Sequence, residues 1–242
     1  MEAKWWTALA LAVLAAGCGS TAAPHLTHRL TPVRVPSQPL PIPPGTGALV
    51  GQVLEPTTIR AAPAGRTLAR VGPQDQFRSP DVMAIVKVLP RWLGVLSPFA
   101  GNGHLGWIPR VAVGLDRVPY ALRVSLSARR LTVLYDGRVV KRYQVAIGAA
   151  YAPTPTGHFA VTDRLTTGTP QGPYGCCILA LSATAPHAIP GWTGGNRIAI
   201  HATPETQSIG QPDSHGCLRV TQSEASWLIY NVPLGTPVVI MA

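Results

Sequence analysis

Short apolar stretches, interrupted by Gly and Pro, run through most of the chain, and this pattern predicts β-structure. Between residues 46 and 113 the stretches are brief and irregular, as expected for a small β-barrel. Further on, two stretches rich in strand-forming residues, 131–135 and 139–147, flank Asp136-Gly137. An Asp-Gly pair supplies the positive φ angles of a tight turn, so these runs predict a β-hairpin. Sheet is therefore expected to open the second folded part, which we place at residues 118–242.

One short helix is predicted, and it begins at Thr221. Thr221 and Glu224 fit a capping box, in which each side chain accepts a hydrogen bond from the other residue's backbone N–H. Apolar residues then recur at helical spacing at Ala225, Leu228 and Ile229. The expected fold class is mainly β, with a sandwich-like second domain whose short helix packs against the sheet.

The first residues of the chain have the pattern of an export signal. Lys4 precedes an apolar run over 5–16, which is too short to span a bilayer as a helix but suits the core of a signal peptide. Leu14-Ala15-Ala16-Gly17-Cys18 then has the pattern of a lipobox. We therefore expect removal of residues 1–17 as a lipoprotein signal peptide and a lipid on Cys18. An ordinary signal peptide that is cleaved elsewhere is the alternative.

Residues 18–45 are rich in Pro, Thr and Ser without a sustained apolar period, so they are expected to form a semi-rigid tether. The whole chain has 20 Lys and Arg against 10 Asp and Glu, a formal net charge of +10. A basic surface suits anionic wall polymers or membrane lipid. The basic residues are scattered and show no recognition motif for nucleic acid, which is therefore not expected as a partner.

The strongest chemical signal is Ser214-His215-Gly216-Cys217, which follows a polar, turn-rich segment. Exported cysteines are normally paired in disulfides, and such a segment is where an accessible thiol is expected instead. Upstream, the apolar run 198–200 leads directly to His201. A thiolate is the nucleophile in cysteine chemistry, and a neighbouring imidazole lowers the thiol pKa and takes its proton. Cys217 and His201 are therefore the predicted nucleophile and base.

These residues resemble the L,D-transpeptidase catalytic domain, the YkuD-like family of bacterial cell-wall enzymes. The resemblance covers roughly the last half of the chain. It rests on segments that stand in the family order: 154–159 (Thr-Pro-Thr-Gly-His-Phe), 172–175 (Gly-Pro-Tyr-Gly), 200–203, 209–210, 214–219 and 234–238. The sequence departs from the family pattern at Ala202, where Gly is common, and at Arg219, where many members carry Asn.

The resemblance implies a reaction on peptidoglycan stem peptides. Cys217 would attack the carbonyl that joins the third, L-centred residue of a stem to the D-alanine that follows it. D-alanine leaves, and an amine on a neighbouring stem resolves the thioester to form a 3→3 cross-link in cell wall biogenesis. His201 would take the thiol proton and return it to the leaving amine. The protein is then expected at the cell membrane, anchored by its lipid and facing the cell wall.

Further roles are implied for the residues around this pair. Backbone N–H groups of the turn at Gly216 are the expected donors to the oxyanion, and His215 is expected to orient the site. Ser214, Arg219 and Tyr174 are expected on the substrate side, where a planar guanidinium suits carboxylates. The resemblance implies neither a cofactor nor a metal, and the oligomeric state is left open.

Several other interpretations remain. Sortases are also exported cysteine transpeptidases with an upstream His, but their Thr-Leu-x-Thr-Cys segment is absent here. A zinc site of His201, His215 and Cys217 has no evident fourth ligand. One further alternative is that Cys217 is a buried apolar residue without a catalytic role. The others are a non-catalytic wall-binding lipoprotein, L,D-carboxypeptidase cleavage, and attachment of proteins to the wall.

The upstream part has a weaker resemblance to a bacterial SH3-like domain, which we place at residues 46–113. It rests on three segments: 58–60, 91–95 and 106–109. Trp92 and Trp107 are expected in its core or on a sheet face, because burial dominates what aromatic residues contribute; a platform for wall peptides is the functional alternative.

Cys176 and Cys177 are adjacent in the sequence. A disulfide between neighbouring residues demands a strained peptide unit. We therefore expect both to be small strand residues without a bond between them, and leave their role open.

Overall fold

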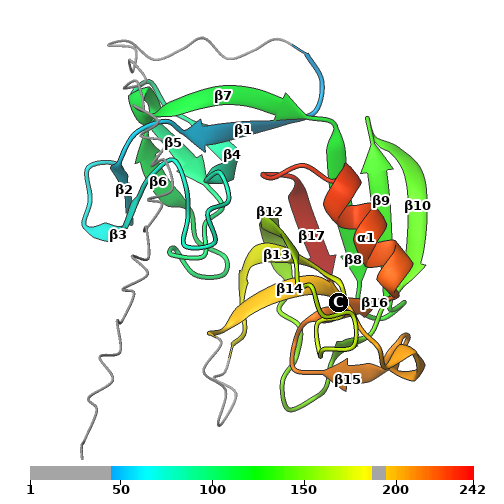
Figure 1. Ribbon diagram of the computed structural model, residues 1–242. Coiled ribbons are helices and arrows are strands. Elements are labelled where there is room, and N and C mark those ends of the chain that lie inside the picture. The colour runs from blue at the N-terminus through cyan, green and yellow to red at the C-terminus, as the bar shows by residue number, and fades with distance from the viewer. Residues whose placement is uncertain (1–44, 187–194) are drawn as a thin grey trace, which may run out of the picture. The chain divides into compact units, whose positions relative to one another are not determined.

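The computed structural model describes residues 45–186 and 195–242 (Figure 1). The predicted signal peptide, Cys18 and all of the tether except Gly45 lie outside the described residues. Within the described ranges there are seven-, eight- and two-stranded sheets and one α-helix, so the predicted mainly β class is confirmed. In the same ranges no helix has the length and apolar character needed to cross a membrane.

The upstream sheet has the strand order β3-β2-β6-β5-β4-β1-β7. Its strands are β1 (Ala48–Val53), β2 (Thr57–Arg60), β3 (Thr67–Val71), β4 (Val82–Val88), β5 (Trp92–Val95), β6 (Gly106–Pro109) and β7 (Val113–Val118), the last preceded by a 3-10 turn at Arg110–Ala112. Val53, Ile59 and Leu93 are fully buried in its core. Strand β7 carries the sheet past residue 113, where we expected the first domain to end.

Trp92 and Trp107 lie on the neighbouring strands β5 and β6, and both are partly buried. The amine of Lys87 lies 5.9 Å from the centre of the Trp107 ring. These positions put both aromatic rings on the sheet. The SH3-like character of this part stays a prediction.

The downstream sheet has the strand order β10-β9-β8-β17-β12-β13-β14-β16. Its strands are β8 (Tyr120–Ser125), β9 (Arg130–Tyr135), β10 (Arg138–Gln144), β12 (Gly157–Thr166), β13 (Cys177–Thr184), β14 (Arg197–Ala202), β16 (Leu218–Val220) and β17 (Pro237–Met241). The pairs β8–β17 and β14–β16 are parallel, and the other neighbours are antiparallel. Strands β11 (Ile147–Gly148) and β15 (Pro212–Ser214) form a separate parallel pair.

The predicted hairpin is present as β9 and β10. Asp136 and Gly137 have φ angles of 46° and 75°, as a tight turn of this kind requires. The second strand is shorter than predicted, because β10 ends at Gln144. Ala146 pairs with Arg219, and β11 pairs with β15, so this part of the chain leaves the hairpin and joins the segment around Cys217.

The predicted helix is α1 (Gln222–Asn231), with Thr221 as its N-cap and both hydrogen bonds of the capping box present. Its buried residues are Ala225, Leu228 and Ile229, the three that the spacing indicates. The helix packs against β13 and β14. The segment after Cys217 is thereby fixed between the sheet and the start of the helix.

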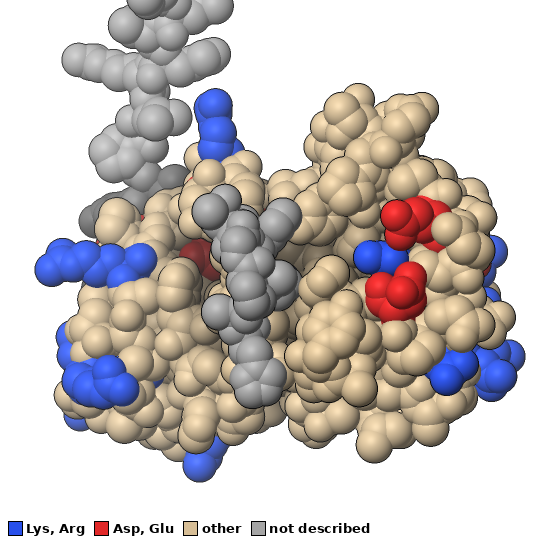
Figure 2. All heavy atoms as spheres, turned by 90° about the horizontal axis from the view of Figure 1, so that it is seen from below, with Lys and Arg blue, Asp and Glu red and all other residues tan. Residues whose placement is uncertain are grey.

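Basic side chains are spread over the molecular surface. Figure 2 shows Lys and Arg at several separate places on the face that it presents, without one continuous patch. On this face, the distribution agrees with the scattered basic residues of the sequence.

The capping box predicts a measurable loss of stability. Thr221→Ala removes the side-chain oxygen that accepts from the Glu224 N–H, and loss of such a cap costs about 1 kcal/mol of unfolding free energy. For a domain of this size that lowers Tm by roughly 2–4 °C in a thermal melt. The control is Tyr230→Ala on the exposed side of α1, where the side chain is 74% accessible and Tm should hardly change. Equal losses in the two variants would contradict the role of the cap.

Candidate active site

Strands β14 and β16 bring together the two residues that the sequence singled out. The strands pair in parallel, with Ile200 opposite Leu218 and His201 opposite Arg219. Cys217 directly precedes β16, and its thiol forms a hydrogen bond with the backbone of Ala199 on β14. His201 and Cys217 both line one cavity of about 300 Å³. A histidine and a free thiol therefore share one cavity wall.

The His201 ring is held in one orientation. Its Nδ1 lies 2.7 Å from the carbonyl oxygen of Ala202. A carbonyl can only accept, so Nδ1 carries the hydrogen and Nε2 is left as the basic nitrogen. The His201 pKa is lowered to about 4, chiefly by burial and also by the charge of Arg219, against the Ala202 hydrogen bond, which raises it. The imidazole is neutral at pH 7 and can accept a proton.

Cys217 is a free cysteine that is partly exposed as a residue. Burial raises its pKa above the ordinary value, while the hydrogen bond from Ala199 and the charge of Arg219 act in the opposite direction. The expected lowering of this pKa is therefore wrong for the resting site, because desolvation of the thiolate outweighs its neighbours. The site at rest holds a neutral thiol and a neutral imidazole.

Tyr174 lies against this pair. Its ring meets the His201 ring edge-on, with 4.9 Å between the ring centres. Burial raises the Tyr174 pKa, and the nearby Cys217 raises it further. Tyr174 comes from the segment between β12 and β13, so three separate parts of the chain form the cavity wall.

The turn before Cys217 is fixed by the hydroxyl of Ser214, which is 1% exposed. Its Oγ accepts from the Gly216 N–H at 3.1 Å and donates to the carbonyl oxygen of Cys217. The Gly216 N–H, an expected donor to the oxyanion, is thus already in use within the loop. Gly216 has a φ of 105°, and a Cβ there would lie 2.9 Å from a methyl carbon of Ile198, so the backbone and its packing require the glycine.

Thr154 was not among the predicted site residues, and the structure adds it. Its Oγ1 donates to the carbonyl oxygen of Gly216 at 2.9 Å and accepts from the Gly148 N–H at 2.8 Å. Thr154 begins one of the segments that carry the family resemblance. The contact joins positions 62 residues apart, however, and no local pattern indicates it.

The family model that describes the YkuD L,D-transpeptidase catalytic domain matches residues 119–240. The chain belongs to this family. The putative L,D-transpeptidase YkuD of Bacillus subtilis is 35% identical over 123 residues, which is 51% of this chain and 66% of that protein, just under two thirds. L,D-transpeptidase 1 of Mycobacterium tuberculosis is 24% identical over 242 residues, covering 84% of this chain and 86% of that protein. A solved L,D-transpeptidase from Mycobacterium smegmatis covers 57% of this chain and 73% of its own, with 21% identity and a TM-score of 0.40.

Arg219 of this L,D-transpeptidase domain lines the cavity. Its Nη1 lies 3.1 Å from Glu205 Oε2 and 3.6 Å from Asp213 Oδ2. Both carboxylates are more than half exposed, so the two ion pairs are largely solvated and weak. His215 also lines the cavity; it is exposed, and its ring packs edge-on against Tyr151 at 5.7 Å. Their expected roles toward substrate and ring orientation stay predictions.

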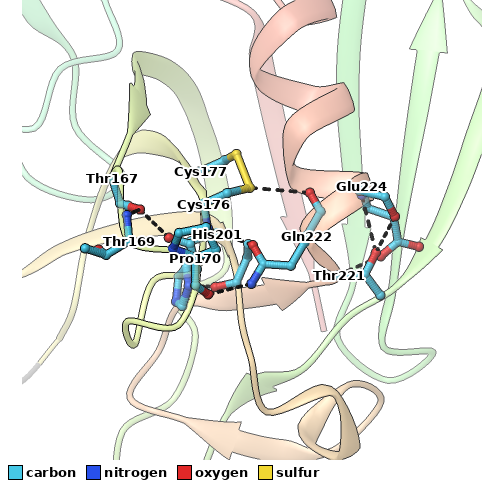
Figure 3. The surroundings of a disulfide bond; sticks show 12 residues. Thr167, Thr169, Pro170, Cys176, Cys177, His201, Thr221, Gln222 and Glu224 are labelled. Carbon is cyan, nitrogen blue, oxygen red and sulfur yellow. Dashed lines mark hydrogen bonds between the residues drawn. A yellow bond between two sulfur atoms is a disulfide. The ribbon is translucent and has the colours of Figure 1, made fainter.

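Cys176 and Cys177 form a disulfide (Figure 3), so the expectation of two unbonded residues is wrong. From the sequence, a disulfide between adjacent cysteines is unfavourable because it strains the peptide unit between them. The sequence does not show the contacts that hold the Cys176–Cys177 segment in place. The Cys176 N–H donates to Gln222 Oε1 at 2.7 Å, and Gln222 Nε2 donates to the Pro170 carbonyl at 2.8 Å. The start of α1 thereby holds the segment that leads from Tyr174 into β13.

A zinc site has no support in the part of the chain that the structure describes. Across 45–186 and 195–242, no three or more His, Cys, Asp or Glu side chains lie together as a metal ion would require. The alternative of a metal held by His201, His215 and Cys217 is therefore set aside.

The neutral thiol predicts the pH dependence of Cys217 alkylation. Because burial raises its pKa, the thiolate fraction and the iodoacetamide rate should climb through neutral pH and keep rising above pH ~8.5, the ordinary thiol value. Pseudo-first-order labelling followed by intact mass measures the rate, with Cys217→Ala as the unlabelled control. A flat rate from about pH 5 to 8 would contradict the neutral pair, because that plateau marks a thiolate–imidazolium pair.

Proposed function

We propose that this L,D-transpeptidase domain forms 3→3 cross-links between peptidoglycan stem peptides through a thioester on Cys217, in cell wall biogenesis. The observation that carries the proposal is the cavity shared by the reachable Cys217 thiol and by His201, whose Nδ1 is held by Ala202. That arrangement leaves Nε2 as the base. Nucleophile and oriented base in one cavity are the requirements of acyl transfer through cysteine.

Acylation begins with the donor stem. Cys217 Sγ attacks the carbonyl carbon before D-alanine while His201 Nε2 takes the thiol proton. The bond to the D-alanine nitrogen then breaks, and His201 returns the proton to that leaving amine. Since both groups are neutral at rest, the imidazolium forms only as the sulfur becomes bonded to carbon. The buried site avoids holding two separated charges before the substrate arrives.

The second half reaction reverses these roles. An amine of the acceptor stem attacks the thioester carbonyl, His201 takes a proton from that nitrogen, and the carbon–sulfur bond breaks. The proton then returns to Cys217 Sγ. Water in place of the amine gives L,D-carboxypeptidase cleavage, so competition between amine and water in the cavity decides the product. We assign Tyr174 and Arg219, which both line the cavity, to substrate contact.

The test is incubation of the purified soluble domain with a tetrapeptide stem and identification of products by mass. We expect a cross-linked dimer and released D-alanine. Cys217→Ala should give no product, and His201→Ala should lose about 10²–10⁴-fold in acylation rate, the usual contribution of general acid–base catalysis. Tyr230→Ala, on the exposed face of α1, serves as the active control. Product from a folded Cys217→Ala variant would exclude the thioester route, and free tripeptide without dimer would favour the carboxypeptidase.

We also propose that the protein is exported and anchored to the cell membrane by lipid on Cys18, facing the wall. The lipobox pattern supports this proposal. Two acyl chains on one residue provide the two signals that stable anchoring needs.

Cys18→Ser tests the anchor. The mature protein should begin at Cys18 and sediment with membranes, whereas the variant should lose the lipid and remain as a precursor or be released. Fractionation with N-terminal mass analysis measures both outcomes. Activity of the catalytic domain should be unaffected, because the family model that describes this domain matches residues 119–240, far from Cys18 in the sequence. A wild-type N-terminus well downstream of Cys18 would refute the lipoprotein assignment without affecting the proposed reaction.

A further inference from the structure

We propose that Thr154 is a positioning residue that aims the backbone N–H of Cys217 at the oxyanion of the acyl-transfer reaction. The inference deepens the proposed function and rests on it, because the oxyanion arises in that reaction. Thr154 does not line the cavity and is 5% exposed, so it acts from behind the nucleophile loop.

Thr154 contacts the peptide unit that joins Gly216 to Cys217. The carbonyl of Gly216 and the N–H of Cys217 belong to the same planar group, and in a trans peptide they point in opposite directions. Thr154 Oγ1 donates to that carbonyl at 2.9 Å. Fixing the carbonyl toward Thr154 turns the N–H to the opposite side. Since Cys217 lines the cavity and Thr154 lies behind it, that side faces the reacting carbonyl.

The N–H of Gly216 is the other candidate donor to the oxyanion. The Gly216 N–H already donates to Ser214 Oγ, and Ser214 Oγ donates onward to the Cys217 carbonyl. The peptide units on both sides of the Cys217 Cα are thus held by hydroxyls, one from Thr154 and one from Ser214. Of the N–H groups of Gly216 and Cys217, that of Gly216 is taken by Ser214 Oγ, so we assign the N–H of Cys217 to the substrate oxygen.

The Thr154 hydroxyl is itself held by the backbone of Gly148. The Gly148 N–H donates to Thr154 Oγ1 at 2.8 Å, so the hydroxyl uses its own hydrogen for Gly216. A Cβ on Gly148 would lie 2.5 Å from the Thr154 nitrogen and 2.3 Å from the Ala152 carbonyl oxygen, so only glycine permits this approach. Gly148 belongs to β11, which pairs with the strand that carries Ser214. The hydrogen bond from Gly148 N–H to Thr154 Oγ1 and the one from Thr154 Oγ1 to the Gly216 carbonyl point the same way along the chain of groups. Each of these bonds therefore polarises and strengthens the other.

The experiment compares two reactions of the same thiol. With p-nitrophenyl acetate, Sγ bonds to the acetyl carbon and p-nitrophenolate leaves, after an intermediate whose oxygen is negatively charged; the thiol proton passes through His201 to solvent. With iodoacetamide, Sγ displaces iodide from a saturated carbon, and no oxyanion forms. A residue that aims an oxyanion donor affects the first reaction alone.

Thr154→Val keeps the shape of the side chain and removes the hydroxyl. We expect acylation to slow by about 10–100-fold, less than or similar to the loss of a whole oxyanion donor, with alkylation within about 2-fold of the wild type at every pH. Thr154→Ser restores the hydroxyl and should recover acylation. Thr156→Val, at an exposed position of the same segment, should leave both rates unchanged. If Thr154→Val does not fold, Thr154→Ala is measured in its place.

Equal losses in acylation and alkylation would overturn the inference, because they would show that Thr154 only supports the loop. Unchanged acylation would overturn it too. The ester does not require recognition of a stem peptide, so the inference and the proposed function fail separately. A wild type that reacts with the ester but makes no dimer from the tetrapeptide refutes the function and leaves the role of Thr154 to be judged from the two rates.

Discussion

The site depends on the parallel pairing of β14 with β16. Parallel neighbours cannot be joined by a tight turn, so the chain between them must leave the sheet and return. The residues of that connection end in the turn that presents Cys217 just before β16, beside the backbone of Ala199. His201 lies near the end of β14, two residues further along the same strand. One register therefore sets the positions of the proposed nucleophile and base, and a slip by one residue would turn His201 to the other face of the sheet.

Burial decides the resting state of this pair. It raises the pKa of Cys217 and lowers that of His201 to about 4, and each pKa unit corresponds to about 1.4 kcal/mol. Both shifts disfavour the ion pair. The charge of Arg219 lowers both pKa values, so it stabilises the thiolate and destabilises the imidazolium. Stabilising the thiolate favours proton transfer from Cys217 to His201, whereas destabilising the imidazolium disfavours it. Arg219 therefore does little to drive this proton transfer.

The predictable parts of the structure are those with local causes. The capping box of Thr221 and the turn at Asp136-Gly137 depend on neighbours in the sequence, and both are present as expected. The resemblance located His201 and Cys217 together. The contacts of the Thr154 hydroxyl and of the Cys176 N–H depend on partners 62 and 46 residues away in sequence, Gly216 and Gln222. No periodicity or spacing encodes such a partner, because it is brought into place by the pairing of distant strands.

If proton transfer is not favoured in the resting site, the stabilisation has to come when the substrate is bound. In the proposed acylation, negative charge develops on the carbonyl oxygen while His201 becomes positive. A donor fixed before the reaction needs no reorganisation to meet that charge, and in a site from which water is largely removed it acts more strongly than in solution. The hydroxyls of Thr154 and Ser214 are both buried and both bonded to the backbone of the turn. Under the proposed mechanism, these contacts set the direction of the Cys217 N–H, and this N–H supplies the stabilisation that the neutral thiol and imidazole lack before the substrate binds.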